Sequence, residues 1–196
     1  MSGAAGRLRI IGGEWRSRVI AFAAGEGVRP TPDRVRQTLF DWLAPRVEGA
    51  TCLDLFAGSG ALGLEALSRG ARRNCFVEQG AAQCAAIRVA LEQLQALSRA
   101  RLVRSDALRW AADEARQSAP ERFDLVFLDP PYARELLQPA LVLLPPLLKT
   151  DNRIYIEWPG DARPQLPAGF EWLREKKAGQ VSFGLLTYSN DQGVNA

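Results

Sequence analysis

The sequence predicts an α/β protein in which a short β-hairpin precedes a mostly parallel sheet with helices on both faces. Three observations lead to this fold class. Short apolar segments alternate with helix-like segments from residue 51 onward. A glycine-rich turn joins the first of these apolar segments to the helix that follows it. Two strand-like segments flank the Gly12-Gly13 pair within residues 8–22, as expected of a hairpin.

The first helix is predicted to begin at Thr31-Pro32-Asp33. Thr31 is the expected N-cap, Pro32 suits the first helical position, and the Asp33 carboxylate suits the first turn. Apolar residues at helical spacing give this helix one face to bury, namely Val35, Leu39, Trp42 and Leu43.

The alternating part of the chain predicts the elements of the sheet in order. Strands are expected at 51–55, 74–77, 101–104, 123–128 and 153–158. Helices are expected at 61–68, 81–97, 107–115 and, broken by prolines, 136–148. A closing hairpin is expected at 170–176 and 181–188. In such a fold, ligands bind at the carboxyl ends of the strands, near the point where strand order reverses.

Composition excludes several kinds of function. The 196 residues contain no histidine, which removes Ser-His-Asp and Cys-His catalysis and the HExxH zinc site. The three cysteines, Cys52, Cys75 and Cys84, are expected to be small buried hydrophobes rather than disulfide partners or metal ligands. Since no apolar run approaches membrane-spanning length and no signal peptide is recognisable, we expect a cytoplasmic protein without a membrane or metal partner.

Positive charge is concentrated at the N-terminal end. Residues 1–36 carry seven arginines and three acids, whereas the rest of the chain carries 18 basic and 19 acidic residues. Charge alone leaves two interpretations open, a solvated arginine-rich segment or a surface that faces phosphates. The candidate phosphate-binding residues are Arg7, Arg9, Arg16, Arg18, Arg29, Arg34 and Arg36.

The glycine-rich turn is the first candidate site. Gly58, Gly60 and Gly63 match G-x-G-x-x-G between a strand and a helix, which alone would equally suit a dinucleotide. Asp54 stands at the strand end, four residues before the first glycine, where its carboxylate would repel a pyrophosphate and suit an ammonium group. Glu78 ends the next strand, where an acid can hold both hydroxyls of a ribose.

The second candidate site is Asp129-Pro130-Pro131-Tyr132, directly after the strand at 123–128. Two prolines stiffen the loop, so that the Asp129 carboxylate and the Pro130 carbonyl would be fixed as hydrogen-bond acceptors. An aromatic ring beside them offers a base a stacking surface. This combination suits an amino group on a planar ring, since two acceptors on its N–H bonds localise its lone pair.

These residues resemble a known family. The segments 54–63 and 129–132 resemble motifs I and IV of the class I amino-methyltransferases, and Thr31-Pro32 resembles their motif X. The N-terminal block further resembles the bacterial 16S rRNA guanine-N2 methyltransferases of the RsmD type, and the likeness runs in colinear order along nearly the whole chain. The segments that carry it are 9–18, 29–40, 57–70, 155–157 and 179–181.

The resemblance implies a Rossmann-like class I methyltransferase fold, a seven-stranded, mostly parallel sheet whose last strand is antiparallel. It implies a basic hairpin extension at 1–28, a catalytic domain at 29–190 and a frayed tail at 191–196. The implied reaction transfers a methyl group from S-adenosylmethionine to N2 of a guanine in 16S rRNA, on the assembled or assembling small subunit, by a monomeric enzyme without a metal.

The resemblance also implies a role for each site residue. Asp129 and Pro130 would orient the target amine, Tyr132 would stack on the guanine, and the arginines listed above would grip the RNA. Glu78 would bind the ribose of the cofactor, and Asp106 with Ala107 would face its adenine. The methionine end would lie against Thr31, Asp54, Phe56, Gly58, Ser59 and Gly60.

Four alternatives stay open at this stage. A DNA or other RNA amino-methyltransferase would use the same motifs, although the chain is short for a large target-recognition domain. A protein-glutamine methyltransferase would favour Asn in place of Asp129. A nicotinamide-dependent oxidoreductase would leave 129–132 without a role, and a non-catalytic RNA-binding module would use the basic hairpin alone.

Overall fold

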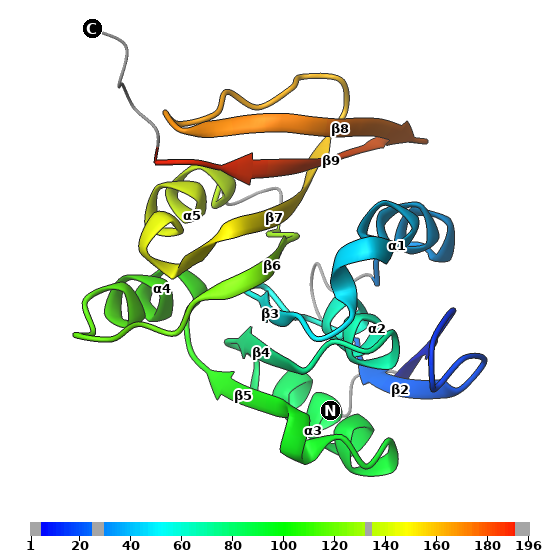
Figure 1. Cartoon of the computed structure of the whole chain (residues 1–196). Coiled ribbons are helices and arrows are strands. Elements are labelled where there is room, and N and C mark those ends of the chain that lie inside the picture. The colour runs from blue at the N-terminus through cyan, green and yellow to red at the C-terminus, as the bar shows by residue number, and fades with distance from the viewer. Residues whose placement is uncertain (1–4, 25–29, 132–134, 191–196) are drawn as a thin grey trace, which may run out of the picture.

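The computed structural model describes residues 5–24, 30–131 and 135–190, as two sheets and the helices packed on them (Figure 1). A small sheet pairs β1 (Ala5–Arg9) with β2 (Val19–Ala23). The large sheet contains β3 (Thr51–Asp54), β4 (Arg73–Glu78), β5 (Ala100–Arg104), β6 (Phe123–Leu128), β7 (Leu148–Pro159), β8 (Phe170–Ala178) and β9 (Val181–Tyr188). The helices are α1 (Asp33–Val47), α2 (Ala61–Ser68), α3 (Ala81–Gln93), α4 (Ala107–Ala115) and α5 (Leu137–Leu143), with short 3-10 turns at Leu97–Arg99 and Pro145–Leu147.

The large sheet has the strand order β5-β4-β3-β6-β7-β9-β8. Strands β3 to β7 are parallel to one another, and β9 pairs antiparallel with both β7 and β8. The predicted fold class, a mostly parallel seven-stranded sheet with an antiparallel last strand, is confirmed. The strand order reverses between β3 and β6, so the switch point lies between the two loops that contain the predicted motifs.

Helices cover both faces of the sheet (Figure 1). Helices α4 and α5 pack on one face, in a core with Leu53, Val126 and Ile156. Helices α1 and α2 pack on the other face, around Phe40 and Phe127. The central strand β6 is apolar at five of its six positions because both of its faces are buried.

The hairpin differs from its prediction in the length of its turn. The expected turn was Gly12-Gly13 itself, but β1 ends at Arg9 and β2 begins at Val19, so residues 10–18 form a longer loop. The loop packs onto α2, and Gly13 has φ +75° with its backbone so close that a Cβ there would lie 1.8 Å from the Ser68 carbonyl oxygen. Apolar residues of the hairpin share a core cluster with α2 and α3, among them Leu8, Ile10, Trp15, Ile20 and Phe22.

The start of α1 is also corrected. The helix begins at Asp33 with Pro32 at the N-cap position, and no side chain caps it. Thr31 therefore lies one residue before the cap, and its hydroxyl donates instead to Asp129 Oδ2 at 3.3 Å. In the part of the chain that the structure describes, no helix has the length and apolar character that spanning a membrane requires.

Candidate active site

A cavity of about 940 Å³ lies at the carboxyl ends of β3, β4, β5, β6 and β7. Its volume is within the range of small-molecule and cofactor sites. These strand ends and the residues that follow them bring together acidic side chains that are far apart in the sequence, namely Asp54, Glu78, Asp106, Asp129 and Glu157. Acidic side chains therefore dominate the part of the cavity that is formed by the carboxyl ends of the strands.

The glycine turn shapes one wall of this cavity. Gly60 has φ +77°, a left-handed conformation that favours glycine, and it leads directly into α2. Gly63 faces β4, where a Cβ would lie 2.3 Å from the Phe76 ring. The motif glycines thus allow the sharp turn and the close packing of α2 on the sheet.

Asp54 lies at the end of β3, buried beneath the turn. Its Oδ2 accepts a hydrogen bond from the Gly63 N–H at 3.0 Å. Burial raises the pKa of Asp54 to about 7; the Gly63 hydrogen bond lowers it, and the nearby Glu78 carboxylate raises it. A carboxyl group in this condition favours a cationic partner, which would restore its ionised form.

Glu78 is held in place by backbone donors on both of its oxygens. The Gly58 N–H donates to Oε2 at 2.8 Å, and the Gly80 N–H donates to Oε1 at 2.7 Å. Each carboxylate oxygen can accept more than one hydrogen bond, so Glu78 keeps acceptor capacity toward the cavity that it lines.

Asp106 has a structural role that the sequence analysis did not assign. It is the N-cap of α4, and its Oδ1 accepts from the Arg109 N–H at 2.9 Å. Asp106 and its neighbour Ala107 also line the cavity. One oxygen of Asp106 is thus committed to the helix, and the other is available to a ligand.

Asp129 follows β6 and faces the same cavity as Asp54. Burial, the Glu157 carboxylate and the Asp54 carboxylate raise the pKa of Asp129, whereas the hydrogen bond from Thr31 lowers it. Pro130 lines the cavity beside it. Tyr132 lies outside the described residues.

Glu157 is the site residue that sequence reasoning missed. It ends an apolar stretch of β7, is only 3% exposed, and accepts a hydrogen bond from the Tyr155 hydroxyl at 2.7 Å. The segment 155–157 counted only toward the family resemblance. An acidic side chain at the end of a buried strand was the available signal.

Most of the predicted cofactor and catalytic residues meet in this cavity. Those that line it are Thr31, Asp54, Phe56, Gly58, Ser59, Glu78, Asp106, Ala107, Asp129 and Pro130. Gly60 does not line it, but sets the turn behind it. The ends of β3, β4, β5 and β6, together with the segment before α1, therefore assemble residues that lie as much as 99 positions apart.

Comparisons with known proteins identify the family. Residues 8–187 match the family model described as Conserved hypothetical protein 95. Ribosomal RNA small subunit methyltransferase D of Escherichia coli K12 is 44% identical over 183 residues, which are 92% of this chain and 89% of that protein. The chain belongs to the RsmD-type family.

Further relatives agree with this assignment. The protein of the same name from Haemophilus influenzae is 40% identical over 93% of this chain and 94% of its own length. The solved structure of yhhF from Escherichia coli superposes with a TM-score of 0.82 at 42% identity, covering 93% of this chain and 98% of that one. The resemblance drawn from the N-terminal block and the two motifs is confirmed, as is the Rossmann-like fold of the RsmD-type proteins.

Five of the seven candidate RNA-binding arginines of this RsmD-type chain lie on its surface. The exposed ones are Arg7, Arg9, Arg16, Arg18 and Arg34. Arg29 lies outside the described residues. The four on the hairpin and its loop belong to a segment whose apolar side is fixed to α2 and α3, so their charges have a defined position relative to the cavity.

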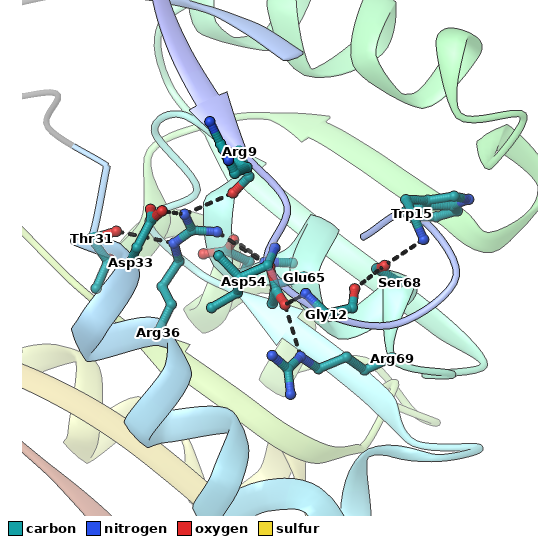
Figure 2. A network of polar contacts seen from close by, with 12 residues as sticks. Arg9, Gly12, Trp15, Thr31, Asp33, Arg36, Asp54, Glu65, Ser68 and Arg69 are labelled. Atoms are coloured by element: carbon teal, nitrogen blue, oxygen red, sulfur yellow. Dashed lines mark hydrogen bonds and ion pairs between the residues drawn. The ribbon is translucent and has the colours of Figure 1, made fainter. Parts of the chain in front are cut away.

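Arg36 is the one arginine for which the prediction is wrong. Its side chain is 0% exposed and forms a network with Glu65, Asp33 and backbone carbonyls of neighbouring segments (Figure 2). A side chain without accessible surface cannot contact a phosphate. Arg36 falls on the buried side of α1, beside Val35, where the charge pattern alone could not distinguish it from Arg34.

The cysteines are buried, as predicted. Burial raises the pKa of Cys52 and raises that of Cys75 to about 12, which makes both unreactive thiols. Within residues 5–24, 30–131 and 135–190, no cluster of three or more histidine, cysteine or acidic side chains could hold a metal ion.

Proposed function

We propose that this protein transfers a methyl group from S-adenosylmethionine to the exocyclic N2 of a guanine in the RNA of the small ribosomal subunit. The observation that carries the proposal is a pair of carboxyls that face one cavity from the ends of the adjacent strands β3 and β6. Asp54 is buried at the end of β3, and the partly buried Asp129 directly follows β6. The names of the relatives support a ribosomal RNA substrate and a methyl transfer.

The cavity residues fit a cationic, adenosine-containing cofactor. Asp54 has a raised pKa and lies beneath the glycine turn, where an ammonium group would be stabilised. Two backbone N–H groups hold Glu78 in place at the end of β4, the strand next to β3. Its carboxylate oxygens could there accept hydrogen bonds from the ribose hydroxyls. Since five acidic side chains line the cavity, it would repel a pyrophosphate, which argues against the nicotinamide alternative.

Asp129 and Pro130 would act on the substrate. Bound S-adenosylmethionine supplies an electrophilic methyl group, so the protein contributes mainly alignment and charge stabilisation. The Asp129 carboxylate and the Pro130 carbonyl would accept the two N–H bonds of the guanine amine and direct its lone pair into the cavity. As the nitrogen bonds to the methyl carbon, the methyl–sulfur bond would break and S-adenosylhomocysteine would leave. Asp129 would stabilise the positive charge on the nitrogen until the nitrogen loses a proton.

The exposed arginines of the hairpin would bind RNA phosphates. A guanine in structured RNA must be splayed out of its stack to enter such a cavity, which requires a grip on the flanking backbone. Arg7, Arg9, Arg16 and Arg18 are exposed and would bind this backbone. These arginines would bind DNA phosphates as well, so the experiment below compares RNA and DNA as substrates.

The test is methyl transfer with tritiated S-adenosylmethionine to assembled small subunits, naked small-subunit rRNA and duplex DNA. We expect transfer to RNA and loss of transfer in Asp129→Ala, with binding of S-adenosylhomocysteine retained. Asp129→Asn, which keeps an acceptor but loses the charge, should retain a small part of the rate. Asp113→Ala, an exposed carboxyl on α4, is the control. Full turnover by Asp129→Ala would refute the assignment, and preferential labelling of DNA would refute the substrate.

A further inference from the structure

A fully buried ion pair joins three segments that meet beside the cavity (Figure 2). Arg36 from α1 and Glu65 from α2 have side chains that are each 0% exposed, with Arg36 Nη1 3.2 Å from Glu65 Oε2. Arg36 Nη2 donates to the Arg9 carbonyl at 2.8 Å and to Asp33 Oδ1 at 2.6 Å. Arg36 Nε donates to the Thr31 carbonyl at 3.1 Å. One guanidinium group therefore contacts β1, α2 and the segment before α1.

Glu65 completes the attachment of the hairpin loop. Its two oxygens accept from the Ile11 N–H at 3.0 Å and the Gly12 N–H at 2.8 Å, and from Arg69 Nε at 2.8 Å. Ser68, one turn further along α2, accepts from the Trp15 N–H at 2.9 Å and donates to the Gly12 carbonyl at 2.6 Å. The loop is thus held by side chains of α2 at several points.

The same network reaches the amine acceptor through Thr31. The Thr31 carbonyl is held by Arg36, and the Thr31 hydroxyl donates to Asp129 Oδ2 at 3.3 Å. Thr31 is 5% exposed. A continuous path of hydrogen bonds therefore leads from the Arg9 carbonyl on the basic hairpin, through Arg36 and Thr31, to Asp129.

Stability alone is a weak reason for a buried ion pair at this place. Replacing such a pair with apolar residues of similar volume is often neutral or stabilising, because desolvation of the charges offsets their attraction. Arginine offers five donors in a fixed planar fork, and a lysine ammonium cannot reproduce that geometry. The arrangement is explained by the need to fix three segments relative to one another.

We propose that Arg36 is a positioning residue that couples the RNA-binding hairpin to the acceptor Asp129. It holds Thr31 so that the Thr31 hydroxyl orients the Asp129 carboxylate, and it holds β1 at a set distance from that carboxylate. RNA bound on the hairpin then presents its target amine to an acceptor whose position is already defined. This inference rests on the proposed methyl transfer.

The test is Arg36→Lys, which keeps the charge and loses the fork. We expect kcat to fall by roughly tenfold or more, since misplacement by about 1 Å can cost on the order of 100-fold, while the Kd for S-adenosylhomocysteine stays within about twofold. The acidic limb of the pH profile should move to higher pH, because Asp129 loses the Thr31 hydrogen bond that lowers its pKa, while Asp54 and Glu157 still face it and raise it.

Two control variants separate positioning from simple destabilisation. Arg46→Lys makes the same change on the same helix, at an ion pair with Asp151. Neither residue lines the cavity, so this variant should leave kcat and the pH profile unchanged. Leu43→Ala removes a buried side chain of α1 and lowers stability without touching the network. If Leu43→Ala reduces kcat as much as Arg36→Lys, well below either unfolding temperature, the positioning role is refuted.

A double-mutant cycle tests the path itself. Thr31→Val removes the hydroxyl and keeps the shape, so the part of the Arg36→Lys effect that passes through Thr31 should vanish in that background. The two substitutions together should then lower kcat by less than the product of their separate effects. Additive effects of the two substitutions would show that Arg36 does not act through Thr31, and would overturn the proposal. Absence of methyl transfer by the wild-type protein would instead refute the proposed function, so the two failures are distinguishable.

Discussion

The acidic cavity and the basic hairpin are fixed to opposite ends of the same short helix. Ala61 and Leu62, at the start of α2, line the cavity. Glu65 and Ser68, toward its end, bind the hairpin loop. The two regions have opposite charge, with buried carboxyls in one and exposed arginines in the other, yet both contact a helix of only eight residues.

The cavity and the hairpin are held in place by different parts of the structure. The cavity is built from the ends of parallel strands, so its residues are fixed by the main sheet. The hairpin is outside that sheet and depends on side-chain contacts with α2 and α3. Substitutions should therefore affect cofactor binding and RNA binding separately, unless they change α2 or the Arg36 network that joins the two.

The largest expected effect is on the attachment of the hairpin. In Gly13→Ala the new Cβ would meet the Ser68 carbonyl at 1.8 Å in a left-handed conformation. We expect the free energy of unfolding to fall by about 3 kcal/mol, from the conformational cost and the overlap with backbone together. Urea denaturation measures this loss.

Gly49→Ala is the matched control for that substitution. Gly49 has φ +71°, close to that of Gly13, but nothing lies within 4 Å of its added Cβ. It should lose only the conformational part, about 1 kcal/mol. Equal losses in the two variants would mean that the hairpin loop moves away from α2 at little cost.

The next effect is on the cavity. Asp54→Asn keeps an acceptor for the Gly63 N–H but removes the charge that would face the cofactor ammonium. Affinity for S-adenosylhomocysteine at pH 8 should fall by roughly 10- to 100-fold, since hydrogen bonds to charged groups contribute about 1.5–3 kcal/mol. RNA binding to the hairpin should stay unchanged. An unaltered Kd in isothermal titration calorimetry would contradict the role of Asp54.

The sequence predicted the cavity better than the hairpin for a physical reason. A glycine pattern after a strand and a rigid Asp-Pro-Pro loop both have local geometric requirements. Asp54 and Asp129 could therefore be placed at strand ends from the sequence alone. The register of the sheet then brought them together. Glu157 was missed because a single acid in an apolar strand has no motif around it.

Local sequence patterns could not separate the exposed arginines from the buried one. Arg34 and Arg36 are two positions apart in one helix, and only the packing of α1 against α2 buries the second of them. Likewise, Thr31 was predicted to cap the helix, whereas its hydroxyl donates a hydrogen bond to Asp129, 98 residues away. Contacts between distant segments decide both cases, and local patterns do not report them.

A smaller effect is expected from pH. The pKa of Asp54 is raised from its ordinary value to about 7, so below pH 7 the carboxyl is increasingly protonated and loses its attraction for the cofactor ammonium. Affinity should therefore rise with pH between 5.5 and 7.0, by up to about tenfold per unit, and level off above 7. The slope should shrink in Asp54→Asn. A wild-type affinity that stays flat over this range would show that Asp54 is already ionised in the free protein.

The smallest effect is expected on RNA affinity, when two charges on the hairpin loop are reversed. Arg16→Glu with Arg18→Glu reverses two exposed charges and should weaken RNA binding by roughly tenfold at low salt, with the slope of log K against log salt reduced by roughly two. Cofactor affinity should not change. Arg109→Glu with Arg116→Glu makes the same change in net charge at exposed positions on and beside α4. If this control weakens RNA binding equally, the RNA responds to the total charge of the protein, and the hairpin has no special part in holding it.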